Sequence, residues 1–124
     1  MLRAIIAAVL LTAIPAHAYE AKNDLIVTDL GNGTYEVRPR GGLSAPAAWC
    51  AMGDYATRIL DLPPTAPLWR VSEPPRAAGQ SILFALTGDG AASKTGLVIL
   101  TDTNASVSAG FASELCWSMS TIVD

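Results

Sequence analysis

Two cysteines are the residues best able to do chemistry in this chain of 124 residues. Cys50 and Cys116 could form a disulfide, bind a metal or supply a nucleophilic thiolate. A catalytic thiol needs a base, usually histidine. The single histidine, His17, lies in a segment that we expect to be removed. Two sulfurs without CxxC spacing or a histidine also make a weak metal site, so we expect a structural disulfide and no metal.

Paired carboxylates are the remaining catalytic possibility, as in glycoside hydrolysis. The candidates are Asp54, Asp61 and Glu73. Asp54 falls on a helix face that we expect to be exposed, Glu73 falls in a loop, and nothing places two of them at a working separation. P-loop, GxSxG, HExxH and CxxCH signatures are absent. We expect solvated surface charges, no enzymatic activity and no cofactor.

Three tryptophans could stack on a ligand, because the indole ring combines a large apolar area with a polar N–H. Trp49 and Trp117 fall at positions where the hydrophobic pattern predicts core. The pattern leaves Trp69 open between core and binding site. We therefore keep Trp69 as a candidate binding residue.

The best candidate contact surface is the proline-rich loop 73–79. Glu73, Pro74, Pro75 and Arg76 occupy its first half. Two prolines reduce the entropy lost on docking, and arginine is enriched at binding hot spots, so we expect Arg76 to project from a stiffened loop. The alternative is a simple connector whose prolines block edge pairing.

Residues 1–18 read as a secretory signal peptide. Arg3 precedes an apolar stretch that ends at Pro15, and Ala16-His17-Ala18 matches the small-x-small cleavage pattern. A membrane anchor would need about 20 apolar residues, and this run is shorter. We predict cleavage before Tyr19, a single domain over 19–124, a periplasmic or secreted location, and no stable membrane insertion.

The charge balance excludes two classes of partner. The chain has 8 basic and 11 acidic residues, and removal of Arg3 with the signal peptide makes the remainder more acidic. Such a chain has no electrostatic footprint for nucleic acid. It also has no polybasic segment for anionic lipid.

The elements that must position these residues begin with a hairpin over 24–30 and 34–38. Asn32-Gly33 is a strong hairpin-turn signal. A two-residue loop would pair Leu30 with Tyr35 and Thr28 with Val37, which gives the hairpin one apolar face.

A helix follows, from the N-cap Ser44 to near Leu62, where Pro63-Pro64 must end it. Cys50 lies at the edge of its apolar stripe, and Gly53 within the stripe permits a close neighbour. Asp54 and Arg58 are four residues apart on the face opposite to the stripe. The stripe itself consists of Trp49, Met52, Ala56, Ile59 and Leu60.

Four further strands are predicted, over 68–71, 81–87, 95–101 and the tail around Cys116. The tail is ambiguous, because Leu115, Trp117 and Met119 alternate as in a strand while 111–115 could form a helical turn. The order β-β-α-β-β-β-β indicates an α+β fold, a small antiparallel sheet with one helix packed on a face. One disulfide would join the helix to the last strand.

The stretch Trp49-Cys50-Ala51-Met52-Gly53-Asp54-Tyr55-Ala56, together with Leu68-Trp69-Arg70 and Cys116, resembles a group of small exported bacterial proteins of unassigned function. The resemblance covers most of the chain after the signal peptide and implies a bacterial periplasmic setting. The resemblance identifies no functional residue in this chain.

We interpret the sequence as a small, exported, disulfide-stabilised domain that binds a protein or an envelope component. The alternatives are a carboxylate-based envelope hydrolase, which would need a cleft with two acids of perturbed pKa, and a carrier of a small apolar ligand, which would need a deep apolar pocket.

Overall fold

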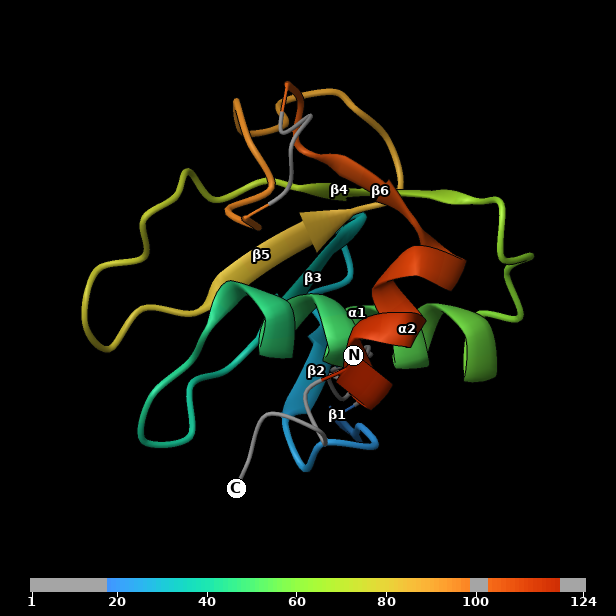
Figure 1. Cartoon of the computed structure of the whole chain (residues 1–124), viewed down its shortest axis with the longest axis horizontal. Helices are drawn as coiled ribbons and strands as arrows, with labels where there is room; N and C mark the ends of the chain where they lie inside the picture. The colour runs from blue at the N-terminus through green and yellow to red at the C-terminus, as the bar shows by residue number, and fades with distance from the viewer. Residues whose placement is uncertain (1–17, 99–102, 119–124) are drawn as a thin grey trace, which may run out of the picture.

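Three layers make up the fold: an antiparallel sheet, a helix packed on it, and a second helix packed on the first (Figure 1). The structure is a computed structural model that describes residues 18–98 and 103–118. The six strands lie in the order β1-β2-β3-β5-β4-β6. The elements are β1 (Ala18–Glu20), β2 (Ile26–Asp29), β3 (Thr34–Val37), α1 (Ala45–Arg58), β4 (Pro67–Arg70), β5 (Ile82–Ala85), β6 (Ser106–Ser108) and α2 (Ala109–Ser118).

The α+β class, the antiparallel sheet and the disulfide are confirmed. The predicted signal peptide falls on residues that are not described, except for Ala18, the first residue of β1. Two short edge strands, β1 and β6, were not anticipated. Within 18–98 and 103–118, no helix combines the length and the apolar character that crossing a membrane requires.

The β2–β3 hairpin forms, but its register differs by one residue from the prediction. Val27 pairs with Val37, and Asp29 pairs with Tyr35. The loop is longer than two residues, because both Gly31 and Gly33 adopt positive φ and the Leu30 N–H bonds to the Thr34 carbonyl. The observed register places Val27 and Val37 in the core. It leaves Leu30 44% exposed.

Helix α1 is buried on all sides along its middle. Ser44 caps it as predicted, accepting a hydrogen bond from the Ala47 N–H. Every residue from 48 to 56 is buried, because the sheet covers one side and α2 the other. The helix ends at Arg58 rather than near Leu62. The N–H groups of Ile59 and Leu60 both bond to the Tyr55 carbonyl, which ends the regular i to i−4 pattern.

The predicted strand over 95–101 does not form in its described part, residues 95–98. Gly96 has φ +81°, which interrupts an extended path. The Thr95 carbonyl is already occupied, since it accepts hydrogen bonds from Trp49 Nε1 and Arg70 Nη1. Strand β4 pairs with β5 on one side and with β6 on the other. Residues 99–101 lie outside the described part of the chain.

The tail around Cys116 is a helix and not a strand. In α2, Ala109, Ala112 and Cys116 recur at helical spacing, and both alanines are fully buried. Small residues let the helix approach α1 closely. This packing outweighs the alternating apolar pattern in the sequence, which is typical of a strand. Trp117 is consequently 59% exposed, which corrects its assignment to the core, and it packs beneath the Lys22 ammonium. Met119 lies outside the described residues.

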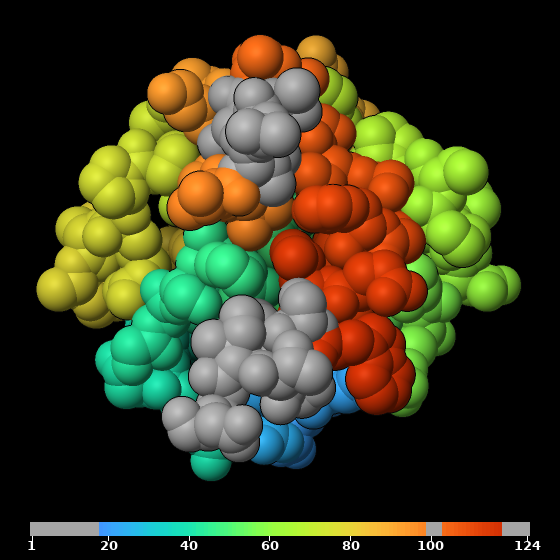
Figure 2. Space-filling model, viewed as in Figure 1, coloured from blue at the N-terminus to red at the C-terminus, as the bar shows by residue number. Residues whose placement is uncertain are grey.

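Gly53 marks the point where the two helices are closest. A Cβ at this position would lie 2.6 Å from the Ser113 backbone nitrogen and 2.8 Å from the Ala112 carbonyl carbon. The predicted close approach at Gly53 is thereby confirmed, with α2 as the neighbour. Figure 2 shows α2 (red) on the outside of this face of the molecule.

The disulfide joins α1 to α2, since the element that carries Cys116 is a helix. The Cys50 and Cys116 Cα atoms are 4.9 Å apart, within the range that a disulfide requires. Cys50 is fully buried. The bond closes a separation of 66 residues, and the chain-entropy model gives loops of this size about 4 kcal/mol of stabilisation.

Replacing both cysteines with alanine should lower the free energy of unfolding by about 2–4 kcal/mol, because the unfolded chain regains the freedom that the bond removes. Urea unfolding monitored by circular dichroism measures this loss. Thiol titration of the native protein should find no free thiol and should find two after reduction in denaturant. Ready labelling of both thiols in the native state would contradict a structural disulfide.

The substitution Gly53→Ala should destabilise the protein by about 1–3 kcal/mol, as expected for overpacking, although alanine favours a helix more than glycine does. The added methyl group meets the backbone of α2, which must shift. Thermal unfolding measures the effect. Gly42→Ala is the matched control, because a Cβ there meets no atom within 4 Å. Equal melting temperatures for the two variants would disprove the tight helix contact.

Candidate functional site

The predicted binding loop lines a cavity of about 240 Å³, called the loop cavity below. The loop forms the left margin of the molecule in Figures 1 and 2, in yellow. Three of the four predicted loop residues, Pro74, Pro75 and Arg76, belong to the cavity wall. The complete lining is Leu43, Ala45, Arg70, Pro74, Pro75, Arg76, Ile82 and Gly96.

Arg76 holds the loop in shape. Its Nε donates to the Leu43 carbonyl at 3.2 Å, and its Nη1 donates to the Ala77 and Gln80 carbonyls at 3.2 and 3.0 Å. The side chain therefore folds back over the loop and does not project from it, contrary to expectation. The physical reason is that carbonyl groups in a loop have no ladder partners and need donors from elsewhere.

Glu73 fastens the start of the loop to a second loop. Its carboxylate accepts hydrogen bonds from the Ser93 backbone N–H, at 2.8 and 3.2 Å, and from the Ser93 hydroxyl. These bonds hold the pKa of the Glu73 carboxyl below its usual value. Glu73 is therefore ionised at neutral pH and is directed at Ser93. It does not line the loop cavity.

Arg70 is a member of the site that sequence reasoning missed. It is 1% exposed. Its Nε donates to the Ser72 carbonyl at 2.7 Å and its Nη1 to the Thr95 carbonyl at 3.0 Å. A side chain on Gly96 would collide with this guanidinium. Side chains alternate between the two faces of a strand, so Arg70 lies on the same face of β4 as the core residue Leu68. This spacing is the signal that could have predicted the burial of Arg70.

Trp69 lies apart from the loop cavity. It alternates with Leu68 and Arg70 and so faces the other side of the sheet, where its ring packs against Gly88. A second depression of about 380 Å³ lies along the turns at one end of β3 and β5. Its lining is Asn32, Gly33, Thr34, Val71, Ala85, Leu86, Thr87, Asp89 and Gly90. The five predicted binding residues therefore do not form one surface.

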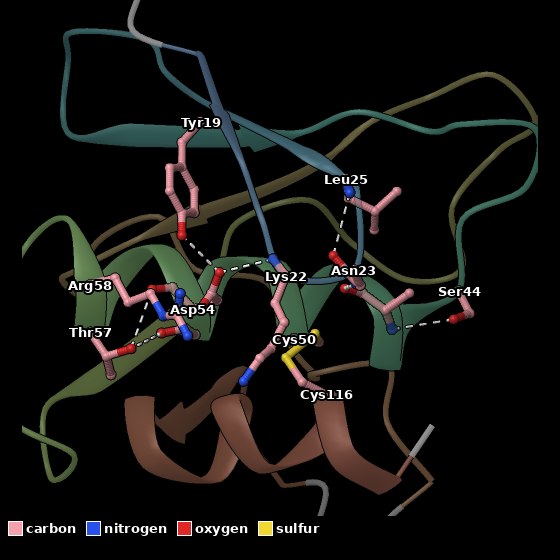
Figure 3. The surroundings of a disulfide bond; sticks show 12 residues. Tyr19, Lys22, Asn23, Leu25, Ser44, Cys50, Asp54, Thr57, Arg58 and Cys116 are labelled. Carbon is pink, nitrogen blue, oxygen red and sulfur yellow. Dashed lines mark hydrogen bonds and ion pairs between the residues drawn. A yellow bond between two sulfur atoms is a disulfide. The ribbon is translucent and has the colours of Figure 1, made fainter. Parts of the chain in front are cut away.

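Asp54 is buried, not exposed as its helical position suggested (Figure 3). Its Oδ2 accepts hydrogen bonds from the Tyr19 hydroxyl and the Lys22 backbone N–H, both at 2.9 Å. Its Oδ1 pairs with Arg58 Nε at 3.0 Å, so the predicted pair is confirmed. The N-terminal segment covers the face of α1 that an isolated amphipathic helix would have exposed.

The tyrosines beside Asp54 are kept in their neutral form. Tyr55 packs between Tyr19 and Tyr35, with ring centroids 5.7 and 5.5 Å apart. Burial raises the pKa of all three phenols, and for Tyr19 the hydrogen bond to Asp54 raises the pKa further. The cluster ties β1 and β3 to α1 beside the buried Asp54.

The three candidate carboxylates have separate surroundings. Asp54 is covered by Tyr19 and Lys22, and Glu73 is directed at Ser93. Asp61 is exposed just beyond the end of α1, with φ +53°. Over residues 18–98 and 103–118, no three His, Cys, Asp or Glu side chains converge as metal ligands would.

Comparison with protein-family models, with curated proteins and with solved structures finds no match to this chain.

The substitution Asp54→Asn should destabilise the protein by about 1.5–3 kcal/mol, the range for a hydrogen bond to a charged group. The amide cannot accept at both positions, and the charge that faces Arg58 is lost. Urea unfolding measures the loss, and amide exchange should show faster opening of residues 18–22. Asp61→Asn is the matched control and should stay within about 0.5 kcal/mol. An equal effect of the two variants would contradict the anchoring role of Asp54.

Proposed function

We propose that this chain is a small exported domain that binds a protein or envelope component through the loop 73–79 and the loop cavity, and that it catalyses no reaction. The observation that carries the proposal is the set of hydrogen bonds from Arg76 to the Leu43, Ala77 and Gln80 carbonyls. They hold an exposed loop in one shape.

A fixed loop favours binding because association then costs less ordering entropy. Glu73 fastens the start of this loop to Ser93, and a turn bond from the Gln80 N–H to the Ala77 carbonyl orders its second half. Pro75, Ala77, Ala78 and Gly79 remain exposed between these anchors. A partner that docks on these exposed residues would therefore meet a loop that is already ordered.

The hydrolase alternative has less support. A general acid needs a raised pKa, whereas hydrogen bonds from Ser93 lower the pKa of Glu73. Asp54, the second candidate, has both carboxylate oxygens occupied by protein donors.

The apolar carrier also has less support. Pockets for drug-sized ligands occupy about 300–1,000 Å³ and are mostly apolar. The loop cavity is smaller and has two guanidinium groups in its wall. The second depression is larger, at about 380 Å³, and its wall mixes the apolar Val71, Ala85 and Leu86 with the side chains of turn residues such as Asn32, Thr87 and Asp89, one of them a carboxylate.

Export is supported by the signal-like residues 1–18 and by the disulfide, because such bonds persist in oxidising compartments.

The test is affinity capture from a bacterial envelope extract with the exported protein, whose intact mass also reports whether it starts at Tyr19. Arg76→Ala should lose a captured partner, with affinity weakened by about 2 kcal/mol or more, as at a hot spot. Arg38→Ala is the control, because Arg38 is exposed and pairs only with Glu36 among the described residues.

Arg76→Ala removes the hydrogen bonds that hold the loop, so its affinity should fall whether or not its melting temperature falls, whereas Arg38→Ala should keep both the affinity and the melting temperature of the parent protein. A change under about 0.5 kcal/mol for Arg76→Ala would mark an energetically neutral position and overturn the proposed surface. Hydrolysis of an envelope substrate by the purified protein would overturn the non-catalytic assignment.

A further inference from the structure

The second depression, of about 380 Å³, lies where two turns meet at one end of the sheet. Thr34 pairs with Ala85, so the β2–β3 turn and the turn that follows β5 leave the sheet side by side. The depression shares no lining residue with the loop cavity. Its volume falls within the range of ligand pockets, about 300–1,000 Å³. It is therefore a candidate site of its own, separate from the loop 73–79.

Hydrogen bonds and packing within the protein order both turns. The Asn32 side-chain carbonyl accepts a hydrogen bond from the Thr34 N–H at 3.2 Å. In the other turn, the Ala91 N–H donates to the Gly88 carbonyl at 3.2 Å. Gly88 also lies against the Trp69 ring, which a Cβ at this position would approach to 3.2 Å. A ligand would therefore lose little affinity to ordering of the wall.

The bottom of the depression is apolar. Ala85 is 8% exposed, and Val71 and Leu86 are half-buried. These side chains can remove C–H groups of a ligand from water, which is favourable. A ligand that is polar on every side would instead lose its hydration there without compensation.

The margin of the depression is polar. Asn32, Thr87 and Asp89 are exposed, and Thr34 is half-buried. Within 18–98 and 103–118, the Asn32 amide nitrogen, both threonine hydroxyls and the Asp89 carboxylate have no hydrogen-bond partner. The amide donates, the carboxylate accepts and the hydroxyls do both. The margin can thus bond a ligand without breaking a bond of the fold.

The charge of the wall disfavours an anion. No lysine or arginine of the described chain lines the depression, and Asp89 adds a negative charge. An anion would lose water and meet repulsion. A neutral ligand that carries hydroxyl groups suits the margin, because each hydroxyl both donates and accepts.

We propose that the second depression binds a neutral sugar, with a C–H face of the ring against Val71, Ala85 and Leu86 and the ring hydroxyls at the margin. A pyranose combines an apolar face with an edge of hydroxyls, so it matches both parts of the wall. The two oxygens of Asp89 accept hydrogen bonds from ring hydroxyls, and such bonds to a charged acceptor are strong. This inference goes beyond the proposed function, because the site does not include the loop 73–79.

The test is a titration of the ¹⁵N-labelled exported protein with the neutral disaccharides maltose, cellobiose and lactose, followed by amide chemical shifts. At least one sugar should shift the amides of residues 32–34 and 86–90 in a saturable manner and leave those of residues 73–79 in place. Absence of saturable shifts with all three sugars, or shifts centred on 73–79, would overturn the inference.

Asp89→Ala should weaken binding of that sugar about tenfold or more, the loss expected when hydrogen bonds to a charged group are removed. Glu114→Ala is the matched control. Glu114 is exposed on α2, on the side of α1 that faces away from the sheet, and its removal should leave the affinity unchanged. Both carboxylates are exposed, so both variants should keep the melting temperature of the parent protein. Equal affinities of the two variants would overturn the site.

Two further measurements separate the sugar from other ligands and this site from the loop cavity. Methylammonium chloride should cause no saturable shift, and displacement of the sugar by methylammonium would assign the depression to a cation and overturn a neutral ligand. Arg76→Ala should bind the sugar as the parent protein does, whatever its effect on partner capture. Loss of sugar binding in Arg76→Ala would overturn the proposed location.

Discussion

The contact between α1 and α2 is the constraint on which the rest of the structure depends. Gly53 brings the two backbones close together, and Cys50–Cys116 joins the helices covalently. With α2 in place, α1 has the sheet on one side and a helix on the other. A helix covered in this way must be apolar nearly all round, and its burial from residue 48 to residue 56 meets that requirement.

The one charged side chain in this buried stretch explains the role of the N-terminal segment. Asp54 faces neither α2 nor open water, because Tyr19 and Lys22 cover it and Arg58 neutralises it. A buried carboxylate needs such partners. The segment that follows the predicted cleavage site is therefore part of the packed domain, and Tyr19, the first residue of the predicted mature chain, carries a structural hydrogen bond.

The loop cavity lies at the N-terminal end of α1. The helix N-terminus, Arg70 and Arg76 surround it, and the hydrogen bonds of Arg76 keep the adjacent loop in shape. The disulfide-bonded layers thus give a rigid base to a loop that has little regular structure of its own. Rigidity of this kind suits recognition, in which loss of loop freedom would otherwise reduce affinity.

The sequence by itself determined the α+β class, the hairpin, the capped helix, the disulfide pairing and the position of the proline-rich loop. Turn residues and helical spacing are local features of the chain, and two cysteines allow only one intramolecular pairing. Tertiary structure alone decided the helical tail, the burial of Asp54 and Arg70, and the exposure of Trp117. Each of these features depends on which other segment of the chain packs against the residues concerned. Periodicity shows that a face is apolar or polar, but only the packed chain shows which segment lies against it.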